Sequence, residues 1–150
     1  MHIKRKGFTL LELIVSLGVL AIVSGVIFFV ISRRDTSYRE IMSATYLLMA
    51  DIRYARQRAI IDGEDVEIVF YGMENRYTIR YFSSWKIIRE VRLPDNVWFM
   101  HSSDLKYHFR PRGTPSVGFT IDLCTVHHRM SVSVVASGGR VRYHDYREVN

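Results

Sequence analysis

The sequence predicts an α+β protein in which a long N-terminal α-helix packs on a C-terminal antiparallel β-sheet domain. Three observations predict this architecture. Residues 8–62 contain no proline and are either continuously apolar or apolar with a helical period. From residue 63 onward the apolar residues alternate with polar ones, as they do in strands. Turn signals with glycine or proline separate the expected strands, which favours antiparallel hairpins.

The first part of the expected helix is long enough to cross a membrane. Residues 13–32 are a run of about 20 residues without a charge, enough to span a hydrocarbon core of roughly 30 Å. Basic residues at 4–6 precede the run, and the positive-inside rule then places the N-terminus in the cytoplasm, although Arg33 and Arg34 partly offset this bias. No A-x-A pattern ends the run, so an ordinary secretory signal is not expected.

Glu12 lies near the start of this apolar segment. An isolated carboxylate in hydrocarbon costs several kcal/mol, so acids in membrane segments usually have a partner. Cleavage after Gly7 would create one, because the new α-ammonium of Phe8 would lie about one helical turn away, in the same chain or in an axially staggered copy. Such a pair would set the register of an assembly. Alternatively, Glu12 rests at the interface and reaches the lipid head groups.

The residues around this cleavage point carry a family resemblance. Lys6-Gly7-Phe8-Thr9-Leu10-Leu11-Glu12 resembles the processing site of type IV prepilins and pseudopilins. The resemblance implies a type IV pilin-like fold with a leader peptide at residues 1–7 and a transmembrane and filament-core helix at 8–32. It also implies cleavage by a prepilin peptidase between Gly7 and Phe8, N-methylation of Phe8, and packing with other pilins through the apolar helix, with Glu12 acting in filament assembly.

Residues 33–62 are expected to form the soluble half of the same helix. An apolar stripe at three- to four-residue spacing predicts the buried face: Ile41, Thr45, Leu48, Ile52, Ala55 and Ala59. Charged residues are expected largely on the other faces: Arg39, Asp51, Arg53, Arg56 and Arg58. Asp62-Gly63 should end the helix, because Gly63 suits the left-handed conformation that follows many helices.

The remaining residues, 63–150, predict one antiparallel sheet on which the helix packs. Alternation predicts a first strand pair, around 66–70 and 77–81, joined by residues 72–76. Further strands are expected at 86–92, 97–101, 105–110, 117–123, 129–136 and 140–146. Ser137-Gly138-Gly139 between the last two predicts a hairpin.

The soluble part is also similar to a narrower family. The segments YLLMADIRYARQRAIIDGEDVEIVF, FRPRGTPSVGFTIDL and MSVSVVASGGRVRY resemble the GspH/FimT group of minor pseudopilins of type II secretion and minor pilins of type IV pili. This resemblance implies a non-enzymatic subunit of a filament in the inner or cytoplasmic membrane. Its sheet domain would face the periplasm or the cell exterior and contact other pilins, a secreted protein or DNA.

Composition gives little support to a catalytic or metal-binding role. Cys124 is the only cysteine, so an intrachain disulfide is excluded, and a small buried hydrophobe is the expected role. His127 and His128 are adjacent on an expected strand and should point to opposite faces, which disfavours a shared metal ion. No nucleophile-elbow or phosphate-loop spacing occurs. We therefore expect no enzyme activity, metal, cofactor or small-molecule substrate.

The C-terminal strand carries the second candidate site. Arg140 and Arg142 flank Val141, so they should project from one face about 6.6 Å apart, and Arg147 follows. Arginines bind phosphate well, and the Gly-Arg-x-Arg ending resembles minor pilins that act in DNA uptake. The alternative is that these arginines are the solvated face of an edge strand. The chain has 21 Lys and Arg against 15 Asp and Glu; without the three basic residues at 4–6, the balance is 18 against 15, or +3, which is only mildly basic.

Overall fold

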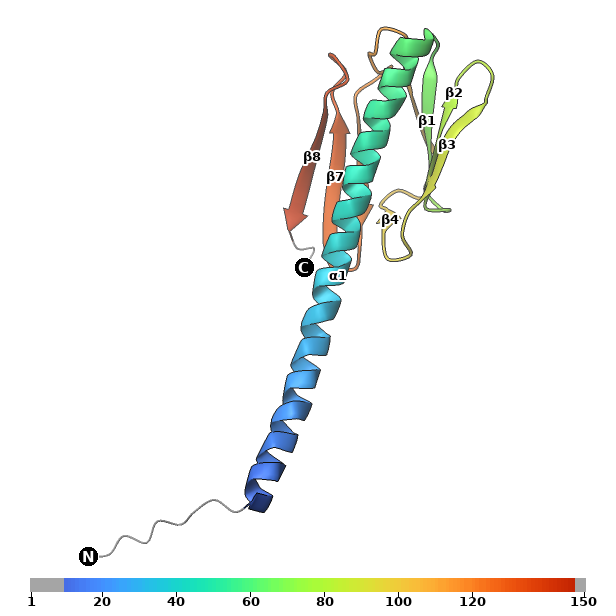
Figure 1. Ribbon diagram of the computed structural model, residues 1–150. Helices are drawn as coiled ribbons and strands as arrows, with labels where there is room; N and C mark the ends of the chain where they lie inside the picture. The colour runs from blue at the N-terminus through green and yellow to red at the C-terminus, as the bar shows by residue number, and fades with distance from the viewer. Residues whose placement is uncertain (1–9, 148–150) are drawn as a thin grey trace, which may run out of the picture. The chain divides into compact units, whose positions relative to one another are not determined.

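The computed structural model describes the backbone of residues 10–147, and their side chains except at 30–35 and 147. Residues 10–147 contain one helix, α1 (Leu10–Asp62), followed by eight strands (Figure 1). The chain divides into two compact units, Met1–Thr36 and Ser37–Asn150. Gly7 and Phe8 lie outside the described residues, so the expected processing site has no structural description.

The soluble half of α1 has the predicted end and the predicted buried face. Asp62 is its last residue, and Gly63 follows with a φ of 67°, a left-handed conformation that glycine adopts without strain. Every member of the predicted stripe is buried: Ile41, Thr45, Leu48, Ile52, Ala55 and Ala59. The apolar period therefore identified the face that packs on the strands.

Asp51 corrects the prediction for the charged residues of this helix. It was expected on an outer face, but its side chain is buried. Its carboxylate accepts a hydrogen bond of 2.7 Å from the Tyr77 hydroxyl, and the Nε of Arg89 lies 3.2 Å from it. These two partners come from strands distant in sequence, and they compensate the burial of the charge.

The strands form two sheets, so the prediction of a single sheet is wrong. The first sheet has the order β3-β2-β1-β5 and consists of β1 (Val66–Tyr71), β2 (Arg76–Tyr81), β3 (Ile87–Arg92) and β5 (Leu105–Phe109). The second has the order β4-β6-β7-β8 and consists of β4 (Trp98–Phe99), β6 (Phe119–Cys124), β7 (His128–Val134) and β8 (Val141–Arg147). All pairs described in both sheets are antiparallel.

The chain crosses between the sheets in its middle. After β3 it enters the second sheet, where Trp98 and Phe99 pair with Cys124 and Leu123 of β6. It then returns to the first sheet, where β5 pairs with β1. Alternation alone predicts each strand but not its partner, which is why the sequence did not reveal two sheets.

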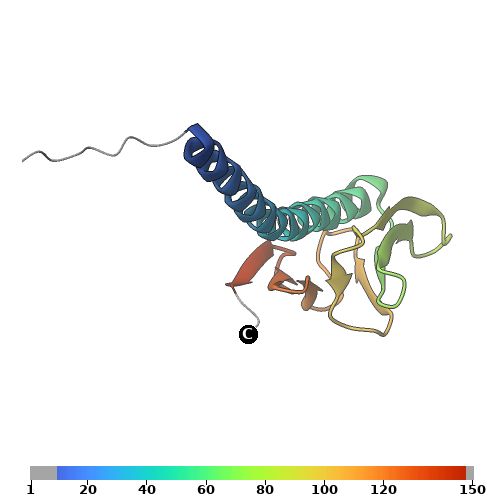
Figure 2. The same cartoon turned by 90° about the horizontal axis from the view of Figure 1, so that it is seen from below.

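One hydrophobic core joins the soluble half of α1 to both sheets. The ring of Phe70 in β1 lies 5.6 Å from that of Phe99 in β4 and 6.4 Å from that of Phe119 in β6. From the helix, the hydroxyl of Thr45 donates to the Met130 sulfur in β7 at 3.4 Å. Figure 2 shows the strands gathered along one side of this half of the helix. This arrangement leaves the opposite side of the helix and the outer faces of the sheets exposed.

Candidate functional site

The first candidate site is the apolar part of α1. Leu10–Phe29 has a mean hydropathy of 2.5 over 20 residues, and none of it is buried in the chain. Its large apolar side chains are exposed, for example 77% for Leu10 and 74% for Phe28. A helix surface that is apolar all round requires lipid or other helices around it.

Glu12 lies in the first described turn of α1 and is exposed. A carboxylate at this position interacts favourably with the positive end of the helix dipole. The Ser16 hydroxyl donates to the backbone carbonyl of Glu12 at 2.7 Å. The site therefore presents an acidic group at the start of an apolar helix.

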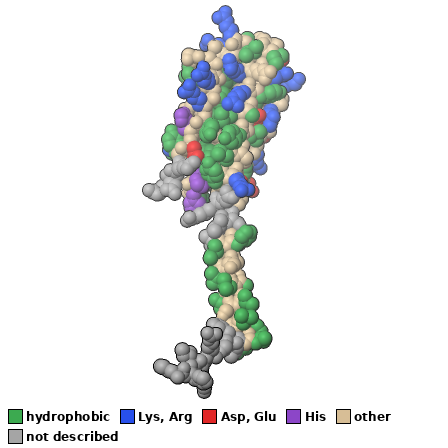
Figure 3. Space-filling model, turned by 60° about the vertical axis from the view of Figure 1, so that its left-hand side comes forward, with side chains coloured by type: hydrophobic (Ala, Val, Ile, Leu, Met, Phe, Trp, Pro, Cys, Tyr) green, Lys and Arg blue, Asp and Glu red, His purple; other side chains and the backbone are tan. Residues whose placement is uncertain are grey.

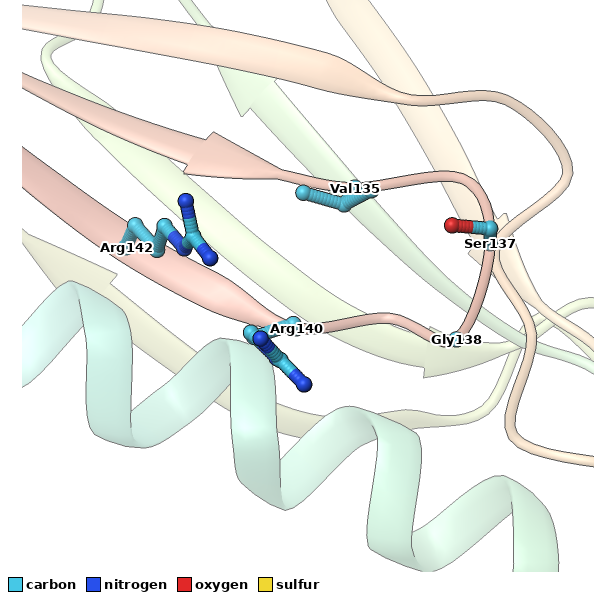
Figure 4. A pocket seen from close by; sticks show the side chains of 5 residues that line it. All are labelled: Val135, Ser137, Gly138, Arg140 and Arg142. Atoms are coloured by element: carbon cyan, nitrogen blue, oxygen red, sulfur yellow. The ribbon is translucent and has the colours of Figure 1, made fainter.

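The second candidate site is a hollow beside the hairpin between β7 and β8. It has a volume of about 380 Å³ and is lined by Val135, Ser137, Gly138, Arg140 and Arg142 (Figure 4). The predicted hairpin is confirmed: Val134 pairs with Val141, and the two glycines of the turn have positive φ, 124° for Gly138 and 65° for Gly139. The turn places both arginines at the same end of β8.

Arg140 and Arg142 are exposed; Arg142 lies on β8, an edge strand with only β7 as a neighbour, and Arg140 directly precedes that strand. Neither guanidinium forms an ion pair with any residue that the structure describes. Arg129 in β7 differs, since its Nη2 lies 2.9 Å from the Asp122 carboxylate. The hollow thus carries two positive charges that other described side chains do not neutralise.

Arg147 does not belong to this hollow. It ends β8, and the register pairs it with His128, whereas Arg142 pairs with Ser133. The two arginines are five residue steps apart along the strand, or about 17 Å. The proposed group of three arginines is therefore divided along the strand.

Two further elements bring arginines to the end of the unit that holds the hairpin. The Nε of Arg56 in α1 donates to the Gly113 carbonyl at 2.9 Å. That carbonyl lies 3.0 Å from the position that a Cβ on Gly139 would occupy, so the hairpin and the residue 110–113 turn are in contact. Figure 3 shows Lys and Arg side chains gathered at this end. In the sequence, the two closely spaced arginines of RPRG, Arg110 and Arg112, indicate this basic end.

The other groups considered from the sequence show no catalytic arrangement. In the part of the chain that the structure describes, no group of three His, Cys, Asp or Glu residues could hold a metal ion. Cys124 is a free, half-buried thiol, and burial raises its pKa, which lowers its reactivity. His127 is exposed and precedes β7, while His128 begins it.

Comparison with protein families decides the identity of the chain. Residues 3–28 match the prokaryotic N-terminal methylation motif, and residues 44–139 match the family described as type II transport protein GspH. The chain belongs to the GspH family. Members of this family and of the related minor pilins are structural subunits rather than enzymes, and the apolar helix with this membership indicates a membrane-anchored, single-pass protein. The GspH match ends at Gly139, so it does not include Arg140 or Arg142.

Two solved structures share the fold of this GspH-family chain. The minor pseudopilin EpsH from the type 2 secretion system of Vibrio cholerae is 12% identical, with a TM-score of 0.61, covering 71% of this chain and 97% of that one. The type IV minor pilin FimU of Pseudomonas aeruginosa is 16% identical, with a TM-score of 0.61, covering 77% and 98%. No curated protein sequence gives a significant match. The predicted α+β, pilin-like fold is confirmed.

Proposed function

We propose that this GspH-family chain is a minor pilin or pseudopilin, a structural subunit of a type II secretion pseudopilus or a type IV pilus. It is inserted with its N-terminus in the cytoplasm, cleaved by a prepilin peptidase after Gly7, and N-methylated at Phe8. The observation that carries the proposal is the methylation motif at residues 3–28, which overlaps the exposed apolar helix Leu10–Phe29. The sheets then face the periplasm or the cell exterior and contact other subunits or a secreted protein.

Glu12 has a specific role in this proposal. Its carboxylate binds the α-ammonium of Phe8 in a neighbouring, axially staggered copy, which fixes the register between helices. The position supports this role, because Glu12 is exposed at the start of an apolar helix, where a charge-assisted bond in low dielectric is strong.

Mass spectrometry of the chain isolated from membranes tests the proposal. We expect a mature chain that begins with N-methylated Phe8, and a Gly7→Glu variant that keeps its leader. A Glu12→Gln variant should be processed normally but be reduced in the filament fraction. An unmutated chain that still begins at Met1 would overturn the proposal.

The basic hollow supports a second candidate function, a DNA-binding minor pilin of a DNA-uptake pilus. The observation that favours it is the pair of exposed arginines, Arg140 and Arg142, without a carboxylate partner among the described residues. Arg147 is not included in this contact, because it lies about 17 Å from Arg142 along β8 and at an odd spacing, which does not share a strand face with Arg142. The solvated edge-strand interpretation remains the alternative.

Fluorescence titration of single-stranded DNA with the full chain in detergent distinguishes these two interpretations. It should be measured at roughly 50 and 200 mM salt, because phosphate contacts weaken steeply with salt. Removing two phosphate contacts with Arg140→Ala/Arg142→Ala should weaken binding and reduce the salt slope by about 1.4, since each contact to a single strand contributes about 0.7. The control is Arg92→Ala/Lys106→Ala, two exposed basic residues of the first sheet. Equal binding by both double variants would exclude the hollow as the DNA site.

A further inference from the structure

The turn between β2 and β3 (Figure 1) holds a tryptophan in a backbone conformation that suits glycine. Trp85 has a φ of 59°, and its backbone N–H donates to the Tyr81 carbonyl at 3.1 Å. Asn75 is the other non-glycine residue with a positive φ in the part of the chain that the structure describes, and asparagine tolerates this conformation. A bulky side chain is strained there, and such strain is concentrated at functional sites. The chain therefore keeps a tryptophan where glycine would cost less, which indicates a role for its side chain.

This turn and the start of β3 present an apolar patch to the solvent. We name it the Trp85 patch, and its three members are Phe82, Trp85 and Ile87, which are 46%, 56% and 54% exposed. The rings of Phe82 and Trp85 are stacked, with their centroids 6.4 Å apart. These two rings alone expose roughly 200 Å². Single exposed apolar residues are ordinary, but a contiguous patch of a few hundred Å² is often an interaction site.

Contacts with the first sheet hold the Trp85 patch in place. Arg80 and Glu67 pair across β2 and β1 on the outer face of this sheet, because the residues that flank them along the strands belong to the core. Nε and Nη2 of Arg80 both bind the Glu67 carboxylate, at 2.8 and 2.6 Å. The guanidinium carbon of Arg80 also lies 4.3 Å from the centroid of the Trp85 ring, and the Phe82 ring lies 5.4 Å from that of His108 in β5. A surface that is ordered before binding loses little entropy when a partner binds.

Charges of both signs surround the Trp85 patch. The Glu64 carboxylate accepts a hydrogen bond of 3.2 Å from the Ser83 hydroxyl in the turn, and Asp65 follows Glu64. Lys86 is next to the patch in the chain, and Lys106 lies on the same face of β5 as the histidine that contacts the patch. Both lysines are exposed and form no ion pair with a residue that the structure describes. The two carboxylates would repel a phosphate backbone, whereas a rim of mixed charge around an apolar centre suits a protein partner.

We propose that the Trp85 patch binds a neighbouring subunit of different sequence, through an apolar side chain that has an acidic and a basic residue beside it. The acid of the partner faces Lys86 or Lys106, and its base faces Glu64. The proposal rests on the proposed function and deepens it, because it assigns the subunit contact of the sheets to one surface of stated chemistry.

The size of the Trp85 patch and the setting of the chain identify the partner as another subunit. A protein that binds from solution usually buries about 800 Å² on each partner, and the patch is much smaller. A subunit anchored in the same membrane has a high effective concentration, which compensates for a small area. Two copies of this chain that joined patch to patch would form a closed pair and would not extend a filament. A minor subunit also has mainly other chains as its neighbours.

Photocross-linking in cells that assemble the native filament tests the proposal. p-Benzoylphenylalanine is incorporated into the full chain at position 85 or, as a control, at position 98, the other tryptophan of the chain, which is 36% exposed on β4 of the second sheet. We expect an adduct at position 85 with a subunit of different sequence, and mass spectrometry should locate the link at an apolar residue beside an acid and a base. Lys86→Glu/Lys106→Glu should reduce this adduct several-fold and leave any adduct at position 98 unchanged. The matched control, Arg140→Glu/Arg142→Glu, should not reduce the adduct at position 85.

A stability measurement separates binding by Trp85 from a role in the fold. Trp85→Asn should leave the midpoint of urea unfolding unchanged or raise it, because asparagine adopts the left-handed conformation more readily. The same variant should reduce several-fold the amount of the cross-linked partner that co-purifies with the chain. A midpoint lowered as much as by Tyr77→Phe, at a buried tyrosine, would assign Trp85 to the fold and overturn the proposal.

The cross-linking experiment has further outcomes that would overturn the proposal. They are no adduct at position 85, an adduct that nuclease removes, an adduct with a secreted protein or a second copy, and an adduct that the lysine substitutions do not reduce. The mass of the mature chain separates this failure from failure of the proposed function. A processed chain that begins at Phe8 but forms no such adduct contradicts only this inference.

Discussion

The charged residues of the soluble unit differ sharply between the core beneath the first sheet and the end that holds the β7–β8 hairpin. Asp51 is buried and is bound by Tyr77 at 2.7 Å and Arg89 at 3.2 Å. At the hairpin end, Arg140 and Arg142 are exposed and form no ion pair with a described residue. Charges in the first region are compensated within the chain, whereas those in the second are available to a partner.

This difference shows which charges maintain the fold. A buried charge that loses its partner is strongly destabilising, while an exposed charge without a partner contributes little to stability. Substitutions in the first region should therefore lower the free energy of unfolding. Substitutions at the hairpin end should change binding and leave stability almost unaltered.

The largest effect is expected for Asp51→Ala. The substitution leaves the buried Tyr77 hydroxyl without its acceptor and Arg89 without its carboxylate, so the free energy of unfolding should fall by about 3 kcal/mol. Urea unfolding of the detergent-solubilised chain, followed by tryptophan fluorescence, measures this change. Asp104→Ala is the control at an exposed acid and should stay within about 0.5 kcal/mol. A loss below about 1 kcal/mol for Asp51→Ala would contradict the conclusion that the buried charges maintain the fold.

Glu67→Gln should have a smaller effect. The Glu67 carboxylate lies 2.6 Å from Nη2 of Arg80, and the two side chains are only 5% and 14% exposed. Removing its charge should cost about 2 kcal/mol. Glu74→Gln is the matched control, because Glu74 also binds an arginine at 2.6 Å but is 54% exposed. It should cost clearly less than Glu67→Gln in the same unfolding experiment, because solvent screens an exposed ion pair. Equal losses would show that burial does not determine the contribution of these pairs.

The hydrogen bond between Tyr77 and Asp51 should make the free energy of unfolding depend on pH in the alkaline range. Burial, and then the hydrogen bond to Asp51, raise the pKa of Tyr77 in the folded chain. The protonated Tyr77 hydroxyl contributes fully to stability below the pKa of an unfolded tyrosine, about 10. Above that pH the unfolded chain loses the proton first, so the contribution falls by up to about 1.4 kcal/mol per pH unit until the pH passes the higher pKa of Tyr77 in the folded chain. The stability advantage of the native chain over Tyr77→Phe should therefore shrink between about pH 9 and 11.5.

Local features of both regions could be predicted from the sequence, but their long-range contacts could not. Gly63 ended the helix and Gly138-Gly139 formed the hairpin as predicted, because each depends on a few adjacent residues. The bond between Tyr77 and Asp51 spans 26 residues, and that between Arg56 and Gly113 spans 57. Such contacts depend on which strands pair, and alternation does not determine the pairing. Asp51 was therefore misplaced, and the arginines that accompany the hollow were not found.

The smallest effect on stability is expected for Arg140→Ala/Arg142→Ala. Both side chains are exposed at the start of an edge strand and make no ion pair with a described residue, so the free energy of unfolding should change by less than about 0.5 kcal/mol. Urea unfolding under the same conditions measures this change, with Gly139→Ala as the contrasting variant. Gly139 has a φ of 65°, and a Cβ there would lie 3.0 Å from the Gly113 carbonyl. Gly139→Ala should therefore cost about 1 kcal/mol or more at the same hairpin. If the double arginine variant is as unstable as Gly139→Ala, these arginines stabilise the hairpin and their role is not limited to binding a partner.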